Sequence, residues 1–317
     1  MSQDVLQQTS VDLAVEVGPL KLKNPVMTAS GTAGYGTEYA GLYDPGLLGA
    51  IAMKGLTRHP REGNRPARWA PTPGGLLNSV GLQNIGVEAF VVEKAAICAE
   101  LAEKGCQPII NLACATQEDF IESVEILEEG CPAAAAYEVN VSCPNVKKGG
   151  CAIGADQNAL ASVVRELRSR TTKPLIVKLL PLVTDIVAMA KVVQNEGADG
   201  ITLVNTIPAM GIDAKTRRPK LGSVTGGLSG PAIKPLALRL VYLTYQATKM
   251  PIIGLGGIQT GEDAIEYMLA GASAVAIGCG QFSNPRAPLM VLEEMAAYCE
   301  EQGVGSIREL TGGLILE

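Results

Sequence analysis

The sequence predicts an α/β protein built as one (β/α)8 TIM barrel, because three observations agree. From about residue 25 onward, short apolar runs alternate with longer segments of helical periodicity, and eight such runs occur. The runs are almost continuously apolar, which is typical of parallel strands that are covered on both faces. Polar residues follow run after run, where the loops at the C-terminal face of a barrel would lie.

The runs expected to form barrel strands are Val26–Ala29, Ile51–Met53, Ile109–Leu112, Tyr137–Val141, Leu175–Lys178, Gly200–Val204, Ile252–Leu255 and Ala274–Gly278. The helices expected between them are Val87–Lys104, Asp119–Glu129, Gln157–Arg170, Asp185–Glu196, Ala232–Thr248 and Glu262–Leu269. Several of these segments end at a glycine, as helices commonly do. An N-terminal β-hairpin is expected before the barrel, and residues 1–317 are expected to form a single domain.

Two longer segments interrupt the alternation and are expected to be loop insertions at the C-terminal face. Thr57–Asn84 is rich in proline, and Ile207–Gly230 is rich in glycine and carries Arg217, Arg218 and Lys220. Long loops on a compact barrel are more often lids or binding loops than spacers. We expect one of the two to order over a substrate, and the sequence does not select which.

Composition narrows the class of protein. With 317 residues, 47% of them hydrophobic, the chain can bury a large core, whereas 18% charged residues and a net charge of −6 argue against a nucleic-acid partner. No apolar run of about 18 residues and no export signal are visible, so a cytoplasmic protein without a membrane segment is expected. Eight cysteines without a CxxC pair, and one histidine, predict reduced thiols and no metal site.

Glycines gather after the last two expected strands, at Gly254–Ile258 and Ala276–Gly280. Backbone N–H groups can approach a phosphate there, and barrels often place a phosphate site at this position. The sequence therefore predicts a phosphorylated ligand or a cofactor such as FMN. The alternatives are simple turn glycines, or a lyase or isomerase barrel that binds a phosphorylated metabolite. No dinucleotide-binding GxGxxG unit accompanies these glycines.

Two lysines, Lys54 and Lys178, stand at the ends of apolar strands, where an unpaired buried ammonium is costly. No Asp or Glu stands at an equivalent strand end, so a bound anion is expected to pair with each lysine. The alternative is a lysine that reaches the rim and pairs with a helix carboxylate.

Asparagines also gather at the expected strand ends and in the first insertion. An amide offers a donor and an acceptor on one flat group, which matches the edge of a cyclic imide or pyrimidine. Taken together they favour a flat, neutral substrate, although each alone could be a turn residue or a cap. They are Asn78, Asn84, Asn111, Asn140, Asn145 and Asn205.

Cys143 is the candidate base. It follows Asn140 by three residues and precedes Pro144, which restricts the backbone before it to an extended conformation. A thiol has an ordinary pKa of about 8.5 and can exchange a proton near neutral pH. The alternative, a small buried thiol, fits the other seven cysteines better because most of them lie in apolar helix or strand segments. His59 lies in a basic, proline-rich loop, where a solvated role is expected.

Four motifs together resemble the FMN-containing dihydroorotate dehydrogenases of pyrimidine biosynthesis. They are "KGLTRHPREGN" (54–64), "NSVGLQN" (78–84), "NVSCPNVKKGG" (140–150) and "GGLSGPAIKPLALRLVY" (226–242). The resemblance runs from about residue 10 to the C-terminal helix. It implies oxidation of (S)-dihydroorotate to orotate by an FMN-dependent oxidoreductase.

The resemblance also implies roles for individual residues. Cys143 would take a proton from C5 of dihydroorotate while C6 delivers a hydride to flavin N5, and Lys178 would stabilise negative charge on the reduced ring. The implied substrate contacts are Lys54, Asn78, Ser79, Val80, Gly81, Leu82, Asn140, Asn205 and Thr206. The implied flavin contacts are Ser30, Lys54, Gly55, Asn111, Asn140, Lys178, Val204, Gly230, Gly256, Gly257, Gly278 and Cys279.

The motifs resemble one subtype most. Membrane-bound members use serine as the base and carry an N-terminal extension, whereas this chain has Cys143. "NVSCPNVKKGG" and "RHPREGN" resemble the NAD-linked class 1B catalytic subunit, which implies a homodimer joined to an FAD and 2Fe–2S subunit as a heterotetramer. The fumarate-linked class 1A enzyme and, more remotely, a dihydropyrimidine dehydrogenase-like flavin barrel are the alternatives. Cys114 and the pair Cys279–Gly280 depart from the family pattern.

Overall fold

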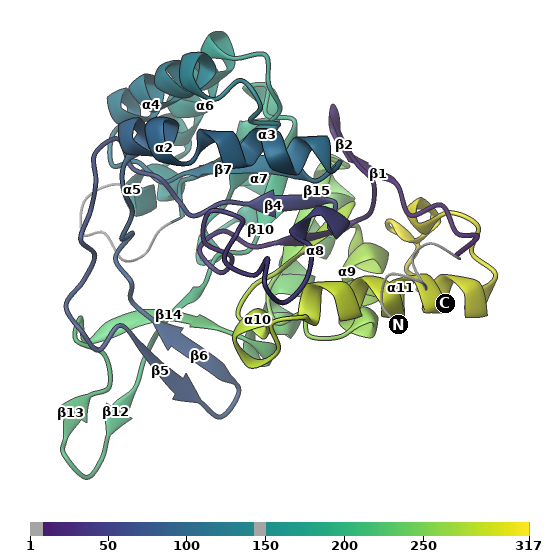
Figure 1. The fold of residues 1–317 in the computed structure, drawn as a ribbon. Helices are drawn as coiled ribbons and strands as arrows, with labels where there is room; N and C mark the ends of the chain where they lie inside the picture. Colours follow the sequence, from purple (N-terminus) through teal and green to yellow (C-terminus); the bar gives the residue numbers. More distant parts are fainter. Residues whose placement is uncertain (1–8, 143–149, 317) are drawn as a thin grey trace.

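The computed structural model describes residues 9–142 and 150–316, and its centre is a closed barrel of parallel strands (Figure 1). All eight expected strands are present, in the order β3-β4-β7-β8-β9-β10-β15-β16, and β16 pairs with β3 to close the ring. Their bounds are β3 Val26–Thr28, β4 Ala50–Ala52, β7 Gln107–Leu112, β8 Ala136–Asn140, β9 Leu175–Lys178, β10 Gly200–Leu203, β15 Ile252–Leu255 and β16 Ala274–Ile277. The predicted barrel is confirmed.

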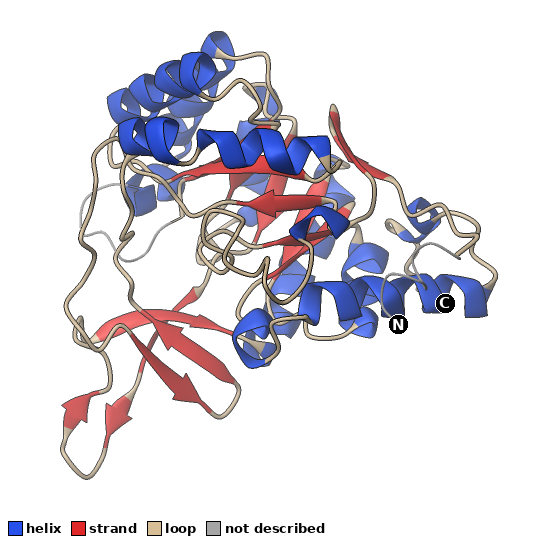
Figure 2. Ribbon diagram, in the orientation of Figure 1, coloured by secondary structure: helices blue, strands red, loops and turns tan. Residues whose placement is uncertain are grey.

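The barrel strands are buried on both faces because helices surround them (Figure 2). The helices are α2 Val87–Glu93, α3 Ala95–Glu103, α4 Gln117–Gly130, α5 Gly150–Ala155, α6 Gln157–Arg170, α7 Ile186–Asn195, α8 Lys234–Thr248, α9 Gly261–Ala270, α10 Gly280–Ser283 and α11 Ala287–Gln302. Three 3-10 turns are η1 Pro45–Leu47, η2 Pro231–Ile233 and η3 Ile307–Leu310. No helix in the described ranges is long and apolar enough to cross a membrane.

The segment predicted as one helix, Val87–Lys104, is instead two helices that meet at Lys94. The backbone of Lys94 leaves the helical region, with φ −129° and ψ −16°. Helix α2 packs against α4, whereas α3 packs against strand β7. The break lets each segment follow its own neighbour.

The expected N-terminal hairpin consists of β1 (Val15–Val17) and β2 (Leu20–Leu22), which pair antiparallel. The first and last residues of both strands, two valines and two leucines, have buried side chains. Gly18 in its turn, with φ +58°, has no room for a side chain, since a Cβ there would lie 2.8 Å from the carbonyl oxygen of Asp199. Asp199 directly precedes β10, so the hairpin covers the N-terminal end of the barrel.

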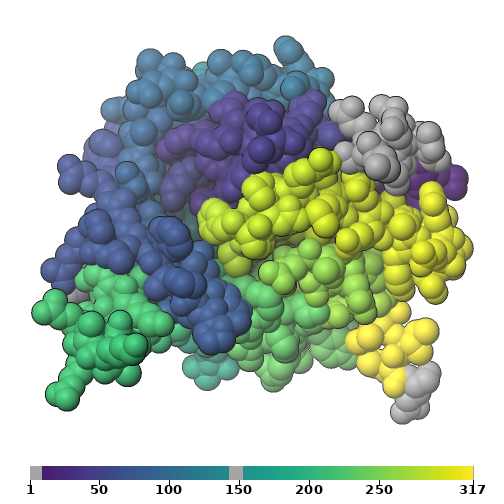
Figure 3. Space-filling model, turned by 60° about the horizontal axis from the view of Figure 1, so that its bottom comes forward, coloured from purple at the N-terminus to yellow at the C-terminus, as the bar shows by residue number. Residues whose placement is uncertain are grey.

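The two insertions form one structure outside the barrel. Strands β5 (Trp69–Thr72) and β6 (Gly75–Asn78) come from the first, and β11 (Ile207–Met210) and β14 (Thr225–Ser229) from the second. They join in the order β11-β14-β6-β5, which we call the outer sheet. It projects from the barrel together with the pair β12 (Ile212–Asp213) and β13 (Arg218–Pro219), and Figure 3 shows the two segments packed side by side.

Candidate active site

A cavity of about 670 Å³ lies at the C-terminal ends of the barrel strands, and the outer sheet forms part of its wall. This volume is in the range of roughly 300–1,000 Å³ that is common for cofactor and small-molecule sites. The predicted site residues that line it are Ser30, Lys54, Gly55, Asn78, Val80, Gly81, Leu82, Asn111, Asn140, Lys178, Val204, Asn205, Thr206, Gly230, Gly256, Gly257, Gly278 and Cys279.

Two of the predicted site residues are not among those that line the cavity. Ser79 is 1% exposed, and its Oγ accepts a hydrogen bond of 2.8 Å from Nδ2 of Asn64. The side chain of Ser79 therefore lies behind the wall of the cavity. Cys143, the predicted base, lies outside the described residues.

The floor of the cavity is organised by Glu138, a residue in β8 that is 2% exposed. Strand register places Asn111 opposite Glu138, and Asn140 opposite Lys178. The Glu138 Oε2 atom accepts a hydrogen bond of 2.5 Å from Asn111 Nδ2 and lies 3.8 Å from Lys178 Nζ. Its Oε1 atom accepts a hydrogen bond of 2.8 Å from the hydroxyl of Thr202. Both carboxylate oxygens of this buried group are thus satisfied.

The expectation that Lys178 needs a bound anion is wrong, because Glu138 supplies the negative charge from within the barrel. Sequence reasoning missed Glu138 because it considered only strand ends, and Glu138 stands two residues before the end of β8. A signal was present in "YEVN", where one acidic residue interrupts an apolar run. Lys178 Nζ also donates to Ser30 Oγ at 3.5 Å.

The other predicted lysine, Lys54, lines the same cavity. A Cβ built on Gly31 would lie 3.6 Å from its Nζ, so the ammonium lies beside the loop that follows β3. Lys54 follows β4 by two residues and Lys178 is the last residue of β9, so the two lysines reach the cavity from the ends of different strands.

Two neighbouring amides face the cavity with opposite polarity. A carboxylate can only accept, so Asn111 must direct its Nδ2 at Glu138 and its Oδ1 away from it. The Oδ1 atom of Asn111 is buried without a hydrogen-bond partner among the described residues. Asn140 is fixed the other way, because the backbone N–H of Ser142 donates to its Oδ1 at 3.2 Å. The cavity thus offers an acceptor at Asn111 beside a donor, Nδ2, at Asn140.

A second hydrogen-bond cluster anchors the residue that precedes Cys143. Asn205 Nδ2 donates to the hydroxyl and to the carbonyl oxygen of Ser142, at 2.9 and 3.2 Å. The Ser142 hydroxyl in turn donates to Asn140 Oδ1 at 2.9 Å. Asn205 was predicted as a substrate contact, but its amide donor is directed at Ser142. Its contribution includes holding Ser142, the residue directly before the predicted base.

The glycine-rich end of the cavity has the backbone conformations that glycine favours. Gly256 and Gly257 have φ values of +135° and +75°, and a Cβ on Gly257 would lie 2.8 Å from the carbonyl oxygen of Gly230. These glycines line the cavity with Gly278 and Cys279, as the phosphate hypothesis requires. Because glycine has no side chain, a ligand can approach the backbone closely at these positions.

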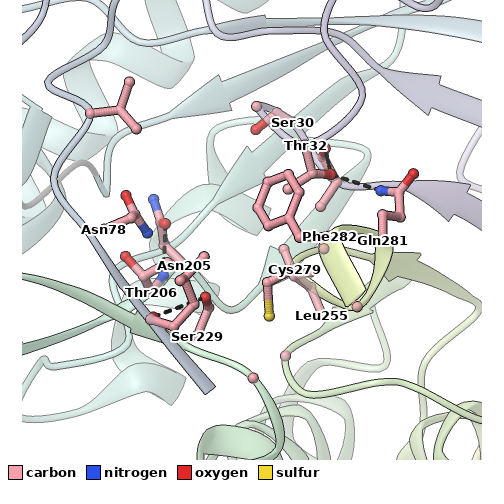
Figure 4. Close-up of a pocket in the computed structure, with 18 of the residues that line it drawn as sticks. Ser30, Thr32, Asn78, Asn205, Thr206, Ser229, Leu255, Cys279, Gln281 and Phe282 are labelled. Carbon is pink, nitrogen blue, oxygen red and sulfur yellow. Dashed lines mark hydrogen bonds between the residues drawn. The ribbon is translucent and has the colours of Figure 1, made fainter. Parts of the chain in front are cut away.

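Gln281 was not predicted and is fully buried at this end of the cavity. Its Nε2 donates to the hydroxyl of Thr32 at 2.8 Å and to the carbonyl oxygen of Ile277 at 2.9 Å. Figure 4 shows Gln281 and Thr32 on one side of an open space and Asn78, Asn205 and Thr206 on the other. No sequence signal separates this buried glutamine from a surface residue of a short helix.

Six cysteines of the described ranges are free thiols: Cys98, Cys106, Cys114, Cys131, Cys279 and Cys299. Five are buried, and burial raises the pKa of Cys106 and of Cys114 to about 12. Cys114, one of the departures from the family pattern, lies 3.6 Å from the hydroxyl of Ser123. Neither thiol can act as a base near neutral pH. Within the described ranges, no cluster of three or more His, Cys, Asp or Glu residues could hold a metal ion.

A closed parallel barrel whose strand ends surround a cavity with several converging polar side chains is the arrangement found in (β/α)8-barrel enzymes. Comparison with known families matches residues 12–298 to the family described as dihydroorotate dehydrogenase. The chain belongs to this family of FMN-dependent oxidoreductases. The resemblance predicted from the four motifs is confirmed.

Curated relatives agree along nearly the whole chain. A protein of Geotalea uraniireducens, named dihydroorotate dehydrogenase B (NAD(+)), catalytic subunit, is 50% identical over 96% of this chain and 98% of its own. The protein of the same name from Porphyromonas gingivalis is 49% identical over the same shares. A crystal structure of DHODH from Eimeria tenella in complex with ferulenol matches with a TM-score of 0.83 at 23% identity, covering 97% of this chain and 90% of that one. At that identity the structural match supports the fold alone.

The residues at the cavity fit the cofactor of the family. A flavin ring carries an imide edge with donors and acceptors, and its reduced form carries negative charge. The cavity offers the buried acceptor of Asn111, the donor of Asn140 and the ammonium of Lys178 at one end. At the other end, glycines expose backbone suited to a phosphate.

Proposed function

We propose that this chain oxidises (S)-dihydroorotate to orotate in pyrimidine biosynthesis, with FMN bound in the cavity at the C-terminal face of a single barrel domain. One observation carries the proposal: the amides of Asn111 and Asn140 and the ammonium of Lys178 converge on one cavity in a member of the dihydroorotate dehydrogenase family. FMN, when bound, supplies the acceptor for a hydride.

The proposed reaction removes a proton from C5 and a hydride from C6 of dihydroorotate, which leaves the C5–C6 double bond of orotate. Cys143, as the thiolate, takes the proton. Ser142, held by Asn140 and Asn205, fixes the backbone directly before Cys143.

The substrate is proposed to lie between Lys54 and the amide of Asn78 in the outer sheet. Lys54 would pair with the carboxylate of dihydroorotate, because an ammonium and a carboxylate attract strongly where water is excluded. The amide of Asn78, whose Nδ2 lies 3.4 Å from the carbonyl oxygen of Gly227, would bind the ring edge. The remaining proposed substrate contacts are Ser79, Val80, Gly81, Leu82, Asn140, Asn205 and Thr206.

The proposed FMN contacts divide between the two ends of the cavity. Asn111, Asn140 and Lys178 would bind the ring. Ser30, Lys54, Gly55 and Val204 would line the space around it, and the phosphate would lie among Gly230, Gly256, Gly257, Gly278 and Cys279.

The first test is anaerobic reduction of the FMN-loaded protein by dihydroorotate, followed by flavin absorbance. Replacement of Cys143 by alanine should leave FMN bound and slow the reduction by at least about a hundredfold, the usual contribution of a general base. Cys299→Ala is the matched control, because Cys299 is buried in α11 and is not among the cavity residues. Reduction of the Cys143 variant at the wild-type rate would reject Cys143 as the base. A protein that binds no FMN would reject the proposed function.

We propose NAD as the final electron acceptor, reached through a partner subunit that carries FAD and a 2Fe–2S cluster in a heterotetramer. The names of the relatives from Geotalea and Porphyromonas, which specify a catalytic subunit and NAD(+), support this proposal. Copurification from the native host should recover a red-brown partner. Turnover with fumarate by the chain alone would instead assign the fumarate-linked subtype. A cytoplasmic location belongs to the same proposal, and cell fractionation tests it.

A further inference from the structure

Among the described residues beneath the cavity, Glu138 is the buried carboxylate that Asn111, Lys178 and Thr202 all contact. Glu138 itself is not among the residues that line the cavity. We propose, on the basis of the FMN site proposed above, that Glu138 is a positioning residue with two effects. It fixes the orientation of the Asn111 amide, and it offsets the charge of Lys178. It thereby sets the balance between the binding of oxidised and of reduced FMN.

The first effect follows from hydrogen-bond polarity. Glu138 accepts from Asn111 Nδ2 at 2.5 Å, and a carboxylate cannot donate in exchange. The amide of Asn111 is therefore locked with Oδ1 turned away from Glu138, where it has no partner among the described residues. A buried acceptor without a partner is destabilising, and a donor on a bound ligand would relieve that cost.

The second effect follows from charge in a dry setting. The side chains of Lys178 and Glu138 are 4% and 3% exposed, and their charged atoms are 3.8 Å apart. Charges buried this deeply interact over longer distances than charges in water. Lys178 alone would favour the negative, reduced form of FMN, and Glu138 opposes this preference. Loss of the Glu138 charge should therefore favour reduced FMN.

The environment of Glu138 permits a substitution that removes the charge and keeps both hydrogen bonds. In Glu138→Gln, the amide oxygen can accept from Asn111 while the amide nitrogen donates to Thr202. The Thr202 hydroxyl, which donates to Glu138 at 2.8 Å in the native protein, can rotate to accept. The variant therefore isolates the effect of charge from the effect of orientation.

The experiment measures the reduction potential of FMN in the intact holoenzyme against a reference dye. Glu138→Gln should bind reduced FMN about tenfold more tightly relative to oxidised FMN, a shift of about +30 mV for a two-electron couple. Glu128→Gln is the matched control. Like Glu138, Glu128 accepts two side-chain hydrogen bonds, in its case from the hydroxyls of Tyr137 (2.9 Å) and Thr171 (2.7 Å). Glu128 is not among the cavity residues. Its variant should keep the wild-type potential.

An unchanged potential in Glu138→Gln with FMN bound would overturn the inference. If that variant does not fold, Thr202→Val provides the test, since it keeps the charge and removes a hydroxyl that orients the carboxylate. FMN should then bind roughly threefold to tenfold more weakly to a protein with wild-type circular dichroism, and wild-type affinity would overturn the inference. Failure of the wild-type protein to bind FMN would reject the proposed function instead, so the two failures are distinguishable.

Discussion

At the scale of single residues, the barrel floor depends on one buried ion pair. Lys178 and Glu138 are both nearly inaccessible, and Glu138 also accepts from Asn111 and Thr202. Removing one partner of such a pair leaves an uncompensated charge, whereas removing both charges can be almost neutral. The pair is therefore a constraint on which single substitutions the site tolerates.

This constraint gives a prediction for the apoprotein. Lys178→Met should lower the free energy of unfolding by about 3 kcal/mol, because Glu138 would remain charged and buried without a counter-charge. The double variant Lys178→Met, Glu138→Gln should recover most of that loss. Urea unfolding of the two variants and the wild type measures both effects. A double variant as unstable as the single one would show that packing, and not charge, dominates.

A second prediction concerns Gly257, which has φ +75° and no room for a Cβ. Gly257→Ala should destabilise the protein by about 1–3 kcal/mol through backbone strain and should weaken FMN binding at the phosphate end. Gly41→Ala is the control, since a Cβ at Gly41 has nothing within 4 Å. Urea unfolding and flavin fluorescence titration would test the pair. Equal effects in the two variants would contradict the assignment.

At the scale of elements, helix α9 begins with a capping box that is tied to helix α8. Thr260 Oγ1 accepts from the backbone N–H of Asp263 at 3.2 Å, and Asp263 Oδ2 accepts from that of Thr260 at 3.0 Å. Lys234 at the start of α8 donates to Asp263 Oδ1 at 2.6 Å. Burial raises the pKa of Asp263, but the hydrogen bonds from Lys234, Gln259 and Thr260 outweigh it and lower the pKa below its usual value.

The lowered pKa of Asp263 sets the sign of a pH dependence. Because the folded pKa is below the unfolded one, the stabilisation is complete above about pH 4 and is lost as the pH falls through the folded pKa. Asp263→Asn should therefore cost about 1–2 kcal/mol at pH 7, and the difference from wild type should shrink in acid. Thermal unfolding between pH 2.5 and 7 measures it. Glu262→Gln, in the same turn, should change stability by less than about 0.5 kcal/mol.

The elements predicted well from the sequence are those whose buried positions produce a recognisable order of apolar and polar residues along the chain. The eight barrel strands follow from short, almost continuously apolar runs, and helices such as α6 follow from apolar residues at helical spacing. The split of α2 from α3 depends on two different packing partners, which no local pattern encodes. The partner of Lys178 was missed because only strand ends were considered, whereas Glu138 stands two residues before the end of β8 and approaches Lys178 across the strand pair. The outer sheet was read as two loops because its strands are short and pair across the chain.

At the scale of the whole molecule, the described residues form two hydrophobic cores of unequal size. The barrel and its helices share one large core, whereas the outer sheet has a small core formed by Ala70, Leu77 and Leu221. Few buried contacts make such a region the first to open. The wall of the cavity is therefore expected to be less stable than its floor.

The small core gives a prediction of local opening. Leu77, 1% exposed, packs there, and Leu77→Ala should destabilise the outer sheet by about 2–3 kcal/mol. Hydrogen exchange should accelerate in β6 and β14 while the strands of the barrel keep wild-type protection. Leu236→Ala, at a side chain that is 54% exposed, is the control and should change neither. Uniform acceleration across the barrel would show that the two cores unfold as one.

The pairing of strands in the outer sheet also determines when the wall of the cavity can form during synthesis. Strand β6 pairs with β14, which leaves the ribosome only after most of the barrel has been made. At about 5–20 residues per second, the interval is on the order of ten seconds. During it, the hairpin of β5 and β6 has no third strand, and an isolated hairpin is marginally stable. Leu77 in β6 therefore stays exposed until β14, from the last third of the chain, has been synthesised and has paired with it. FMN can bind to a complete site only after this pairing.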